Sequence, residues 1–306
     1  MSGEYDIEVH KRRVEFDASL RMALQTEESM VWAFTEAHDV SSEYGRAFDE
    51  MGPFSAPDAI VGKLQALPIK PLAFSRRWLQ TSKWHDERHW DDFDLTKTLT
   101  NPASSVIRNF SSAWNRFKDV VAVTAMLGPV RRGMDGPGND PDTTFDSTNQ
   151  AVLLNYVPSG SATNSGLTRA KVVATKQKFM ANRAGSRELH FAISSKEWAD
   201  LINDDKFTDA NYRLVMGDQS NGIVGYMGFY WHMYEDLPVV VGSPSYRRCI
   251  AWSRDGVRTG VVKEPQAGLT RREDMVGYPW QAHWWAEIGA ARADEKLVVE
   301  IQTLAA

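Results

Sequence analysis

Two histidines four residues apart, His85 and His89, are the residues whose type and spacing first suggest chemistry. On a helix this spacing places both imidazoles on one face, where they can bind a divalent metal ion with nearby carboxylates. Carboxylates follow at Asp91, Asp92 and Asp94. The zinc-protease pattern, however, needs a helix and a Glu directly after the first histidine, whereas this segment reads as extended and has Asp86 there. We therefore expect a polar segment that faces solvent or another subunit, with a metal site as the alternative.

The other residues with reactive side chains are isolated from one another. Cys249 is the single cysteine, which excludes an intramolecular disulfide and a cysteine-based zinc site, and its apolar neighbours predict a buried strand thiol. His232 and His283 lie in aromatic strands, so we expect packed, hydrogen-bonded imidazoles rather than general bases. No serine has a nucleophile-elbow context, and the glycines of GPGND and GIVGYMG lack the lysine of a phosphate loop. The sequence predicts no catalytic residue, no metal and no cofactor.

Composition restricts the class of protein further. The chain has 306 residues, of which 42% are hydrophobic and 25% charged, as in soluble folded proteins. Residues 1–60 hold 13 acidic and five basic side chains, a net charge of -8 within a total of -5. Such a segment repels phosphate, so tight direct binding to nucleic acid is not expected. No apolar run has the length of a membrane span, and no signal peptide is evident, so we expect a cytoplasmic protein.

The elements that must position these residues are organised around one long helix, expected at residues 101–128. Asn101 is a suitable cap, Pro102 suits the first turn, and Gly128 precedes the proline that ends the run. An apolar stripe at spacings of three and four comprises Val106, Phe110, Ala113, Trp114, Phe117, Val121 and Ala125. The opposite face is polar and carries no cluster of acids, bases or ligands, so the helix is expected to be a structural support.

Before this helix, the chain reads as an arm followed by a two-stranded excursion. Residues 16–39 and 41–51 are expected to be acidic, amphipathic helices. Four prolines between residues 53 and 71 disfavour regular structure. Residues 74–95 have two halves that mix aromatic and polar side chains, which favours a pair of strands that needs a neighbour to cover it. The chain's 11 tryptophans also favour extensive subunit contacts.

After the helix, the pattern alternates between strands and shorter helices. Residues 129–144 hold three Gly and three Pro and are expected to be a mobile surface loop. We expect strands at residues 151–157 and 189–193, helices at 168–182 and 196–202, and strand pairs within 222–241. A hairpin is expected from residues 248–252 and 256–262, and two final strands at 280–288 and 297–301. This combination favours a mixed α/β protein that assembles with itself.

The order of these elements resembles that of a major capsid protein of a tailed double-stranded DNA bacteriophage, with the Hong Kong 97-type capsid fold. Three segments carry the resemblance. The run from Gly166 to Phe207 is similar to the helix, strand and short helix that open the axial domain. GYMGFYWHMYEDLP resembles the glycine-containing strand pair of that domain, and WWAEIGAARADEKLVVEIQT resembles the terminal strands. These are matches of pattern, so their order and spacing carry the similarity.

The resemblance implies an α+β fold with five consecutive parts. An N-terminal arm would comprise residues 1–70 and an extended loop residues 71–100. A peripheral domain with a spine helix would span residues 101–158, and an axial domain residues 159–270. Residues 271–306 would return to the peripheral domain.

The resemblance also implies a structural function rather than an enzymatic one. The chain would assemble with itself, as pentamers and hexamers, into an icosahedral shell around phage double-stranded DNA, without sequence-specific DNA binding or a membrane. Its implied location is the virion capsid, after assembly in the host bacterial cytoplasm. Implied partners are a scaffolding protein, a portal and, optionally, a decoration protein. The candidate subunit-interface residues in the extended loop are Trp78, Trp84, His85, His89, Trp90 and Phe93.

Two alternatives remain at this point. A cellular nanocompartment of the encapsulin type resembles the same fold but encloses an enzyme. A metal-dependent hydrolase built on His85 and His89 belongs to a different class of protein.

Overall fold

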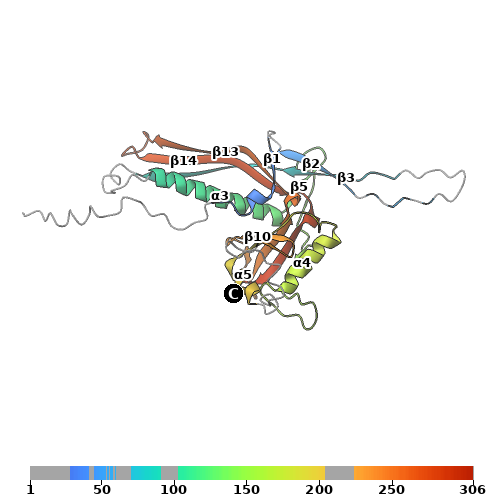
Figure 1. Cartoon of the computed structure of the whole chain (residues 1–306). Helices are drawn as coiled ribbons and strands as arrows, with labels where there is room; N and C mark the ends of the chain where they lie inside the picture. The colour runs from blue at the N-terminus through green and yellow to red at the C-terminus, as the bar shows by residue number, and fades with distance from the viewer. Residues whose placement is uncertain are drawn as a thin grey trace, which may run out of the picture. The chain divides into compact units, whose positions relative to one another are not determined.

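The structure is a computed structural model, shown in Figure 1, that describes residues 28–40, 45–52, 54, 56–57, 59, 70–90, 103–203 and 224–305. The chain forms two units. The smaller unit comprises Met1–Glu28, Lys83–Arg116 and Glu264–Ala286, and the larger unit comprises Ser29–Ser82, Phe117–Lys263 and Glu287–Ala306. None of the helices in the described ranges is long and apolar enough to cross a membrane.

The predicted long helix is present as α3, Ala103–Leu127, and the caps expected at Asn101 and Pro102 lie outside the described residues. Phe110 and Trp114 are buried, as the apolar stripe predicts. In the second half of the helix, however, the buried side chains are Asp119, Ala122, Val123 and Met126, whereas the predicted stripe positions are only half-buried. The two halves belong to different units, so one stripe cannot describe both.

A seven-stranded sheet carries the main core of the larger unit. In spatial order its strands are β7 Ala151–Val152, β15 Val298–Leu304, β12 Tyr246–Ser253, β8 Leu189–Ile193, β10 Phe229–Met233 and β9 Val224–Tyr226, while β11 Val239–Val240 pairs with β12. All five side chains of β8 are buried, because both faces of the sheet are covered there. The strand predicted at residues 189–193 is therefore confirmed, and the one predicted at 151–157 is shorter than expected.

Two helices of this unit begin within one residue of the predicted starts, residues 168 and 196. In α4, Arg169–Ala181, the Thr168 hydroxyl accepts a hydrogen bond from the Lys171 amide at 3.4 Å. In α5, Ser195–Ile202, Ser194 and Glu197 form a reciprocal capping box, which satisfies two backbone donors at the helix start. Both helices are confirmed because their start signals are local in the sequence.

A second sheet has the order β2-β3-β5-β6 and corrects two predictions. Its strands are β2 Arg46–Met51, β3 Phe74–Leu79, β5 Val130–Arg132 and β6 Asp140–Thr143. The helix expected at residues 41–51 is wrong, because β2 pairs antiparallel with β3 from Arg46↔Leu79 to Met51↔Phe74. The loop expected at residues 129–144 contains the β5–β6 pair. Pairing with distant strands overrides local propensity in both segments.

The third sheet has the order β1-β13-β14-β4. Its strands are β1 Glu36–Asp39, β13 Val257–Arg271, β14 Trp280–Arg292 and β4 Ser82–Trp90. Before β1 lies the short helix η1 Trp32–Phe34, so the helix expected through residue 39 does not extend that far. The two halves of residues 74–95 do not pair with each other, because β3 and β4 belong to different sheets.

Two turns carry the chain from one sheet to another, and the first of them corrects a further prediction. At η2, Arg254–Gly256, the chain leaves β12 for β13, so the expected hairpin between these segments is wrong. At η3, Glu295–Leu297, it leaves β14 for β15, so the two final strands lie in different sheets. The burial of β14 alternates as predicted, whereas the first four residues of β15 are all buried. Continuous burial is typical of a strand that is covered on both faces.

Candidate assembly surface

The six residues expected at a subunit interface lie in different environments. Trp78 is half-buried in β3, and its indole Nε1 donates a hydrogen bond to the carbonyl of Gly133 at 2.8 Å. This contact ties the residue to its own unit. Trp90 ends β4, with a side chain that the structure does not describe, and Phe93 lies outside the described residues.

The remaining three candidates, Trp84, His85 and His89, are exposed on β4 in the smaller unit. In the described part of the chain, β14 is the one sheet neighbour of β4, which makes β4 an edge strand. Edge strands present backbone donors and acceptors to which another chain can bind. At the edge, the Gln281 side chain donates to the Glu87 carboxylate at 2.6 Å and fastens β4 to β14.

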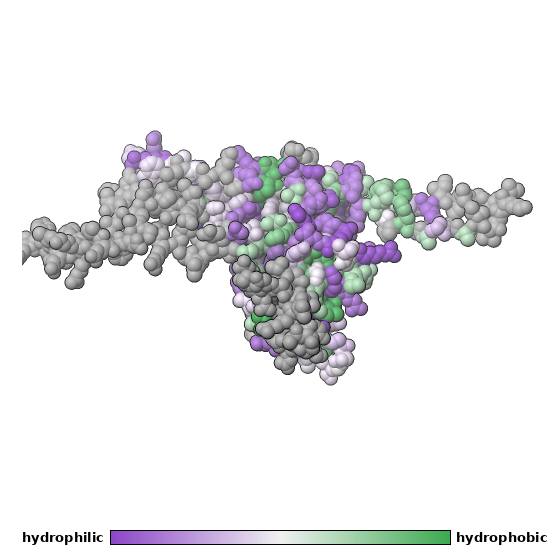
Figure 2. All heavy atoms as spheres, viewed as in Figure 1, coloured by the Kyte–Doolittle hydropathy of each residue, from purple (hydrophilic) through white to green (hydrophobic). Residues whose placement is uncertain are grey.

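The turn between β13 and β14 presents an apolar tip, Met275–Tyr278, which sequence reasoning did not single out. Met275, Val276 and Tyr278 are 44%, 104% and 54% exposed. Gly277 and Tyr278 both have positive φ angles, 88° and 46°, which shape the tight turn. Figure 2 shows that hydrophobic groups interrupt the otherwise largely hydrophilic coloured surface in separate patches. Exposed apolar patches with polar rims mark interaction sites.

Charged side chains hold this tip in one conformation. The Arg272 guanidinium donates to both oxygens of Asp274, at 2.7 and 2.6 Å, and to Gln281 Oε1 at 3.1 Å. The hydrogen bond from Arg272 lowers the pKa of Asp274 to about 2. The Arg272 amide also donates to the Pro279 carbonyl at 2.9 Å. A tip fixed in this way loses little conformational entropy when it binds.

Beneath the exposed residues of the smaller unit lies a tryptophan pair. Trp114 of α3 and Trp284 of β14 have ring centroids 5.0 Å apart and meet edge to face at 66°. His283 is half-buried and packs closely against Gly268, where an added Cβ would lie 2.7 Å from Nε2. Packing of His283 is therefore as predicted, although its Nδ1 has no hydrogen-bond partner.

The other residues considered for chemistry are buried in the core of the larger unit. Cys249 is fully buried in β12, as predicted, and burial raises the pKa of its thiol. His232 is packed and within 3.0 Å of a second histidine, His190, as expected for a hydrogen-bonded core residue. Within the described ranges, no group of three or more His, Cys, Asp or Glu side chains is placed to hold a metal ion. Asp91, Asp92 and Asp94 lie outside those ranges.

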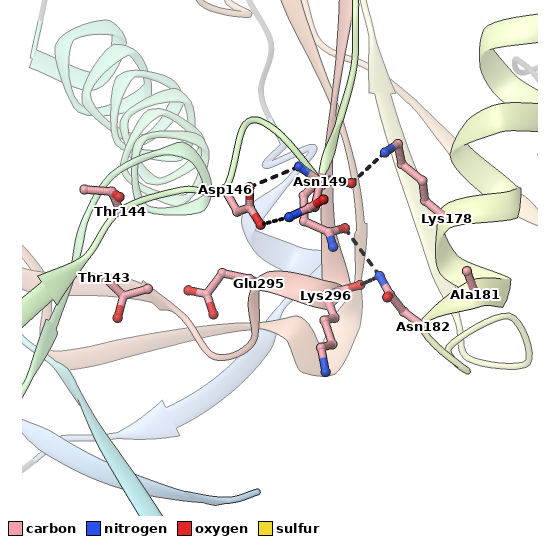
Figure 3. Close-up of a pocket in the computed structure, with 10 residues that line it drawn as sticks. Thr143, Thr144, Asp146, Asn149, Lys178, Ala181, Asn182, Glu295 and Lys296 are labelled. Carbon is pink, nitrogen blue, oxygen red and sulfur yellow. Dashed lines mark hydrogen bonds between the residues drawn. The ribbon is translucent and has the colours of Figure 1, made fainter. Parts of the chain in front are cut away.

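An open pocket of about 700 Å³ in the larger unit is lined by polar side chains that already have partners (Figure 3). Asp146 accepts hydrogen bonds from the Thr148 and Asn149 amides at 3.1 and 3.0 Å, and the bonds from Asn149 lower its pKa. Lys178 Nζ donates to the Asn149 carbonyl at 2.5 Å, and Asn182 Nδ2 to the Lys296 carbonyl at 3.2 Å. These contacts join the segments that line the pocket, and their arrangement does not indicate a catalytic reaction.

Comparison with known proteins shows the class to which this chain belongs. The family model described as "Phage capsid protein" matches residues 10–305, so the chain belongs to the phage capsid protein family. No curated protein matches the sequence.

Solved capsid structures share the fold over nearly the whole chain. The cyanophage Pam1 capsid asymmetric unit matches with 13% identity and a TM-score of 0.69 and covers 100% of both chains. The capsid of Helicobacter pylori bacteriophage KHP30 matches with 9% identity and a TM-score of 0.71 over 99% of both chains. The capsid of Ralstonia phage GP4 matches with 12% identity and a TM-score of 0.64 over 95% of both. The chain is a structural major capsid protein of a bacteriophage, a component of the virion capsid.

Proposed function

We propose that the chain forms the icosahedral shell of a tailed phage, as pentamers and hexamers that enclose double-stranded DNA. The match to capsid chains over nearly their full length supports this proposal, because the fold is shared along almost all of the chain. Assembly would take place in the host cytoplasm with a scaffolding protein and a portal, and decoration proteins are an optional addition. The family match does not favour an encapsulin-type compartment or a metal-dependent hydrolase, and the family and its structural neighbours are structural proteins rather than enzymes.

The division into parts follows the Hong Kong 97-type scheme with two changed boundaries. We assign the extended loop to the β2–β3 pair and its connection, in place of residues 71–100. The pairing of Arg46–Met51 with Phe74–Leu79 supports this, as does the hydrogen bond from the Gly52 amide to the Ala73 carbonyl at 2.8 Å, which continues the pair. We assign β15 to the axial domain with the seven-stranded sheet. We assign α3 as the spine helix, and the arm would be the part of the chain that precedes β2.

We further propose that β4 and the Met275–Tyr278 tip contact other subunits. Both combine exposed aromatic or apolar side chains with a fixed backbone. Shell subunits share several interfaces, so contacts that are individually weak add up to a stable assembly. The acidic arm would face inward, where its charge would repel DNA and keep the shell wall from gripping it.

Negative-stain electron microscopy of the expressed protein, with and without its scaffolding protein, tests the proposed function. Uniform shells, tubes or capsomers are expected, and a strictly monomeric protein under all scaffolded conditions would refute it. Trp84→Ala should reduce assembly while leaving the urea midpoint of the subunit unchanged. Trp84→Phe is the matched control, because it retains an aromatic ring at the same position. Normal shells from folded Trp84→Ala subunits would remove β4 from the interface.

A further inference from the structure

Two buried histidines lie where the segment before β1 contacts the seven-stranded sheet. His190 of β8 and His232 of β10 are on neighbouring parallel strands, and Nδ1 of His190 is 3.0 Å from Nε2 of His232. The two residues are 1% and 9% exposed. When both rings are neutral, one of these two nitrogens donates and the other accepts, while Nε2 of His190 is buried without a hydrogen-bond partner. This contact between the two histidines does not involve the proposed assembly surfaces, β4 and the Met275–Tyr278 tip.

The aromatic ring of Phe34 covers the pair. Its centroid lies 4.0 Å from that of His232 and 5.1 Å from that of His190. Trp252 of β12 stacks on His190 at 5.5 Å, and its indole Nε1 donates to the Phe34 carbonyl at 3.0 Å. Thr35 then contacts Thr259 Oγ1 through its own hydroxyl at 2.9 Å. The two imidazoles therefore form part of the seat that holds the segment Ser29–Phe34.

Few charges face the two rings, and the carboxylate of Asp119 on α3 binds the start of the segment, at residues 29–32. Just before β8, Glu188 Oε1 lies 3.5 Å from His190 Nε2, but Glu188 is about half exposed and is also 4.0 Å from Arg254 of η2. Asp255, the next residue of η2, pairs with Arg187. His232 packs against the rings of Phe34, Trp252 and His190. On β10, Tyr230 contributes a ring 5.6 Å from His190.

A proton on either ring would place a charge under an aromatic cover. Burial lowers the pKa of His190 and of His232 to about 4, from 6.5. A lowered histidine pKa means that the docked segment binds fewer protons than the released one. Docking is therefore at full strength above pH 6.5 and weakens as the pH falls towards 4.

We propose that the His190–His232 pair is an acid-operated latch, which holds the segment Ser29–Phe34 on the seven-stranded sheet while both rings are neutral and releases it when a ring is protonated. The releasing ligand is the proton alone. The latch acts on the segment that leads from the N-terminal part of the chain into β1. It does not depend on which surfaces join the subunits.

Hydrogen–deuterium exchange of the full chain, compared at pH 7 and pH 4.5 after correction for intrinsic rates, measures the release. The reporter amides are those of Phe34 and Thr35, which donate to Val31 and Trp32 carbonyls at 3.1 and 3.2 Å. One ring whose pKa falls from 6.5 to about 4 predicts a roughly 50-fold rise in opening at pH 4.5. Amides of β15 should keep their protection. The latch proposal would be overturned if the exchange rate of the Phe34 amide did not rise at pH 4.5, or if the amides of β15 lost protection to the same extent.

Four variants separate the latch from general acid sensitivity. His190→Asn combined with His232→Gln keeps polar atoms in place but cannot titrate, so the pH dependence at Phe34 should disappear. His85→Gln, at an exposed histidine of β4, is the matched control and should leave it unchanged. Glu188→Gln removes the carboxylate that raises the pKa of His190, so release should require a lower pH. If neither Glu188→Gln nor the single variant His232→Gln moves the midpoint, the proposal is overturned even where the double variant fails to fold.

Discussion

Asp119 fixes residues 29–32 to helix α3, and its replacement gives a graded prediction. Its carboxylate is 1% exposed. Oδ1 accepts hydrogen bonds from the Ser29 hydroxyl at 2.6 Å and from the Val31 and Trp32 amides at 2.9 Å each. Oδ2 accepts one bond, from the Met30 amide at 2.8 Å. The two oxygens therefore carry unequal numbers of partners.

The unequal number of hydrogen bonds at Oδ1 and Oδ2 determines how much stability each substitution should remove. A hydrogen bond to a charged group contributes about 1.5–3 kcal/mol. Asp119→Asn can keep an oxygen at the Oδ1 position, so it loses mainly the Met30 bond and should cost about 2 kcal/mol of unfolding free energy. Asp119→Ala loses all four bonds and should cost about 4 kcal/mol, less than their sum, because burying the carboxylate is itself costly.

Urea unfolding of unassembled subunits, followed by tryptophan fluorescence, measures both losses. The matched control is Thr124→Ala, an exposed position on the same helix, which should change stability by less than about 0.5 kcal/mol. Hydrogen exchange at the Met30, Val31 and Trp32 amides localises the effect. If both Asp119 variants matched the control and these amides stayed protected, the carboxylate would not hold the segment.

Three further substitutions test the packing and the charges. Trp284→Ala should lower the free energy of unfolding in urea by about 3–5 kcal/mol, because it leaves a cavity next to Trp114. Trp285, which is 43% exposed, provides the control. An equal loss of stability for Trp285→Ala would contradict this prediction. Gly289→Ala would place a Cβ 2.0 Å from the Gln80 carbonyl, so we expect a loss of soluble folded protein, and wild-type yield and melting temperature would speak against this close approach. Burial tends to raise the pKa of Glu295, but Arg77 and Arg292 lower it overall, so its stabilising effect is present above the usual value of 4.5 and is lost as the pH falls. In Glu295→Gln, the free energy of unfolding should therefore fall less steeply as the pH is lowered. If its pH dependence were unchanged, Glu295 would not contribute to the acid sensitivity of the fold.

Elements whose signals are local could be predicted from the sequence. The caps Thr168 and Ser194 precede apolar-periodic runs, and both helices begin there. The alternation from Trp280 to Ile288 predicts the half-covered strand β14. Pairing partners could not be predicted, because β2 and β5 acquire their strand conformation from β3. The sheet to which β15 belongs was missed for the same reason.

The candidate surface was only partly accessible to sequence reasoning. The mixed aromatic and polar pattern indicated the exposure of Trp84, His85 and His89. The Met275–Tyr278 tip has no such pattern, because its exposure follows from a turn that Arg272 and Asp274 stabilise. Asp119 was not singled out, since an acid that binds distant backbone amides has the same local sequence as a solvated one.

The position of β15 has a consequence for synthesis. This strand, Val298–Leu304, lies between β7 and β12, so the last part of the sequence fills an interior place in the seven-stranded sheet. At a translation rate of about 5–20 residues per second, β7 and β12 wait on the ribosome without the strand that joins them. The sheet is incomplete until residue 304 has emerged. Nascent chains therefore lack a finished core until synthesis has passed β15.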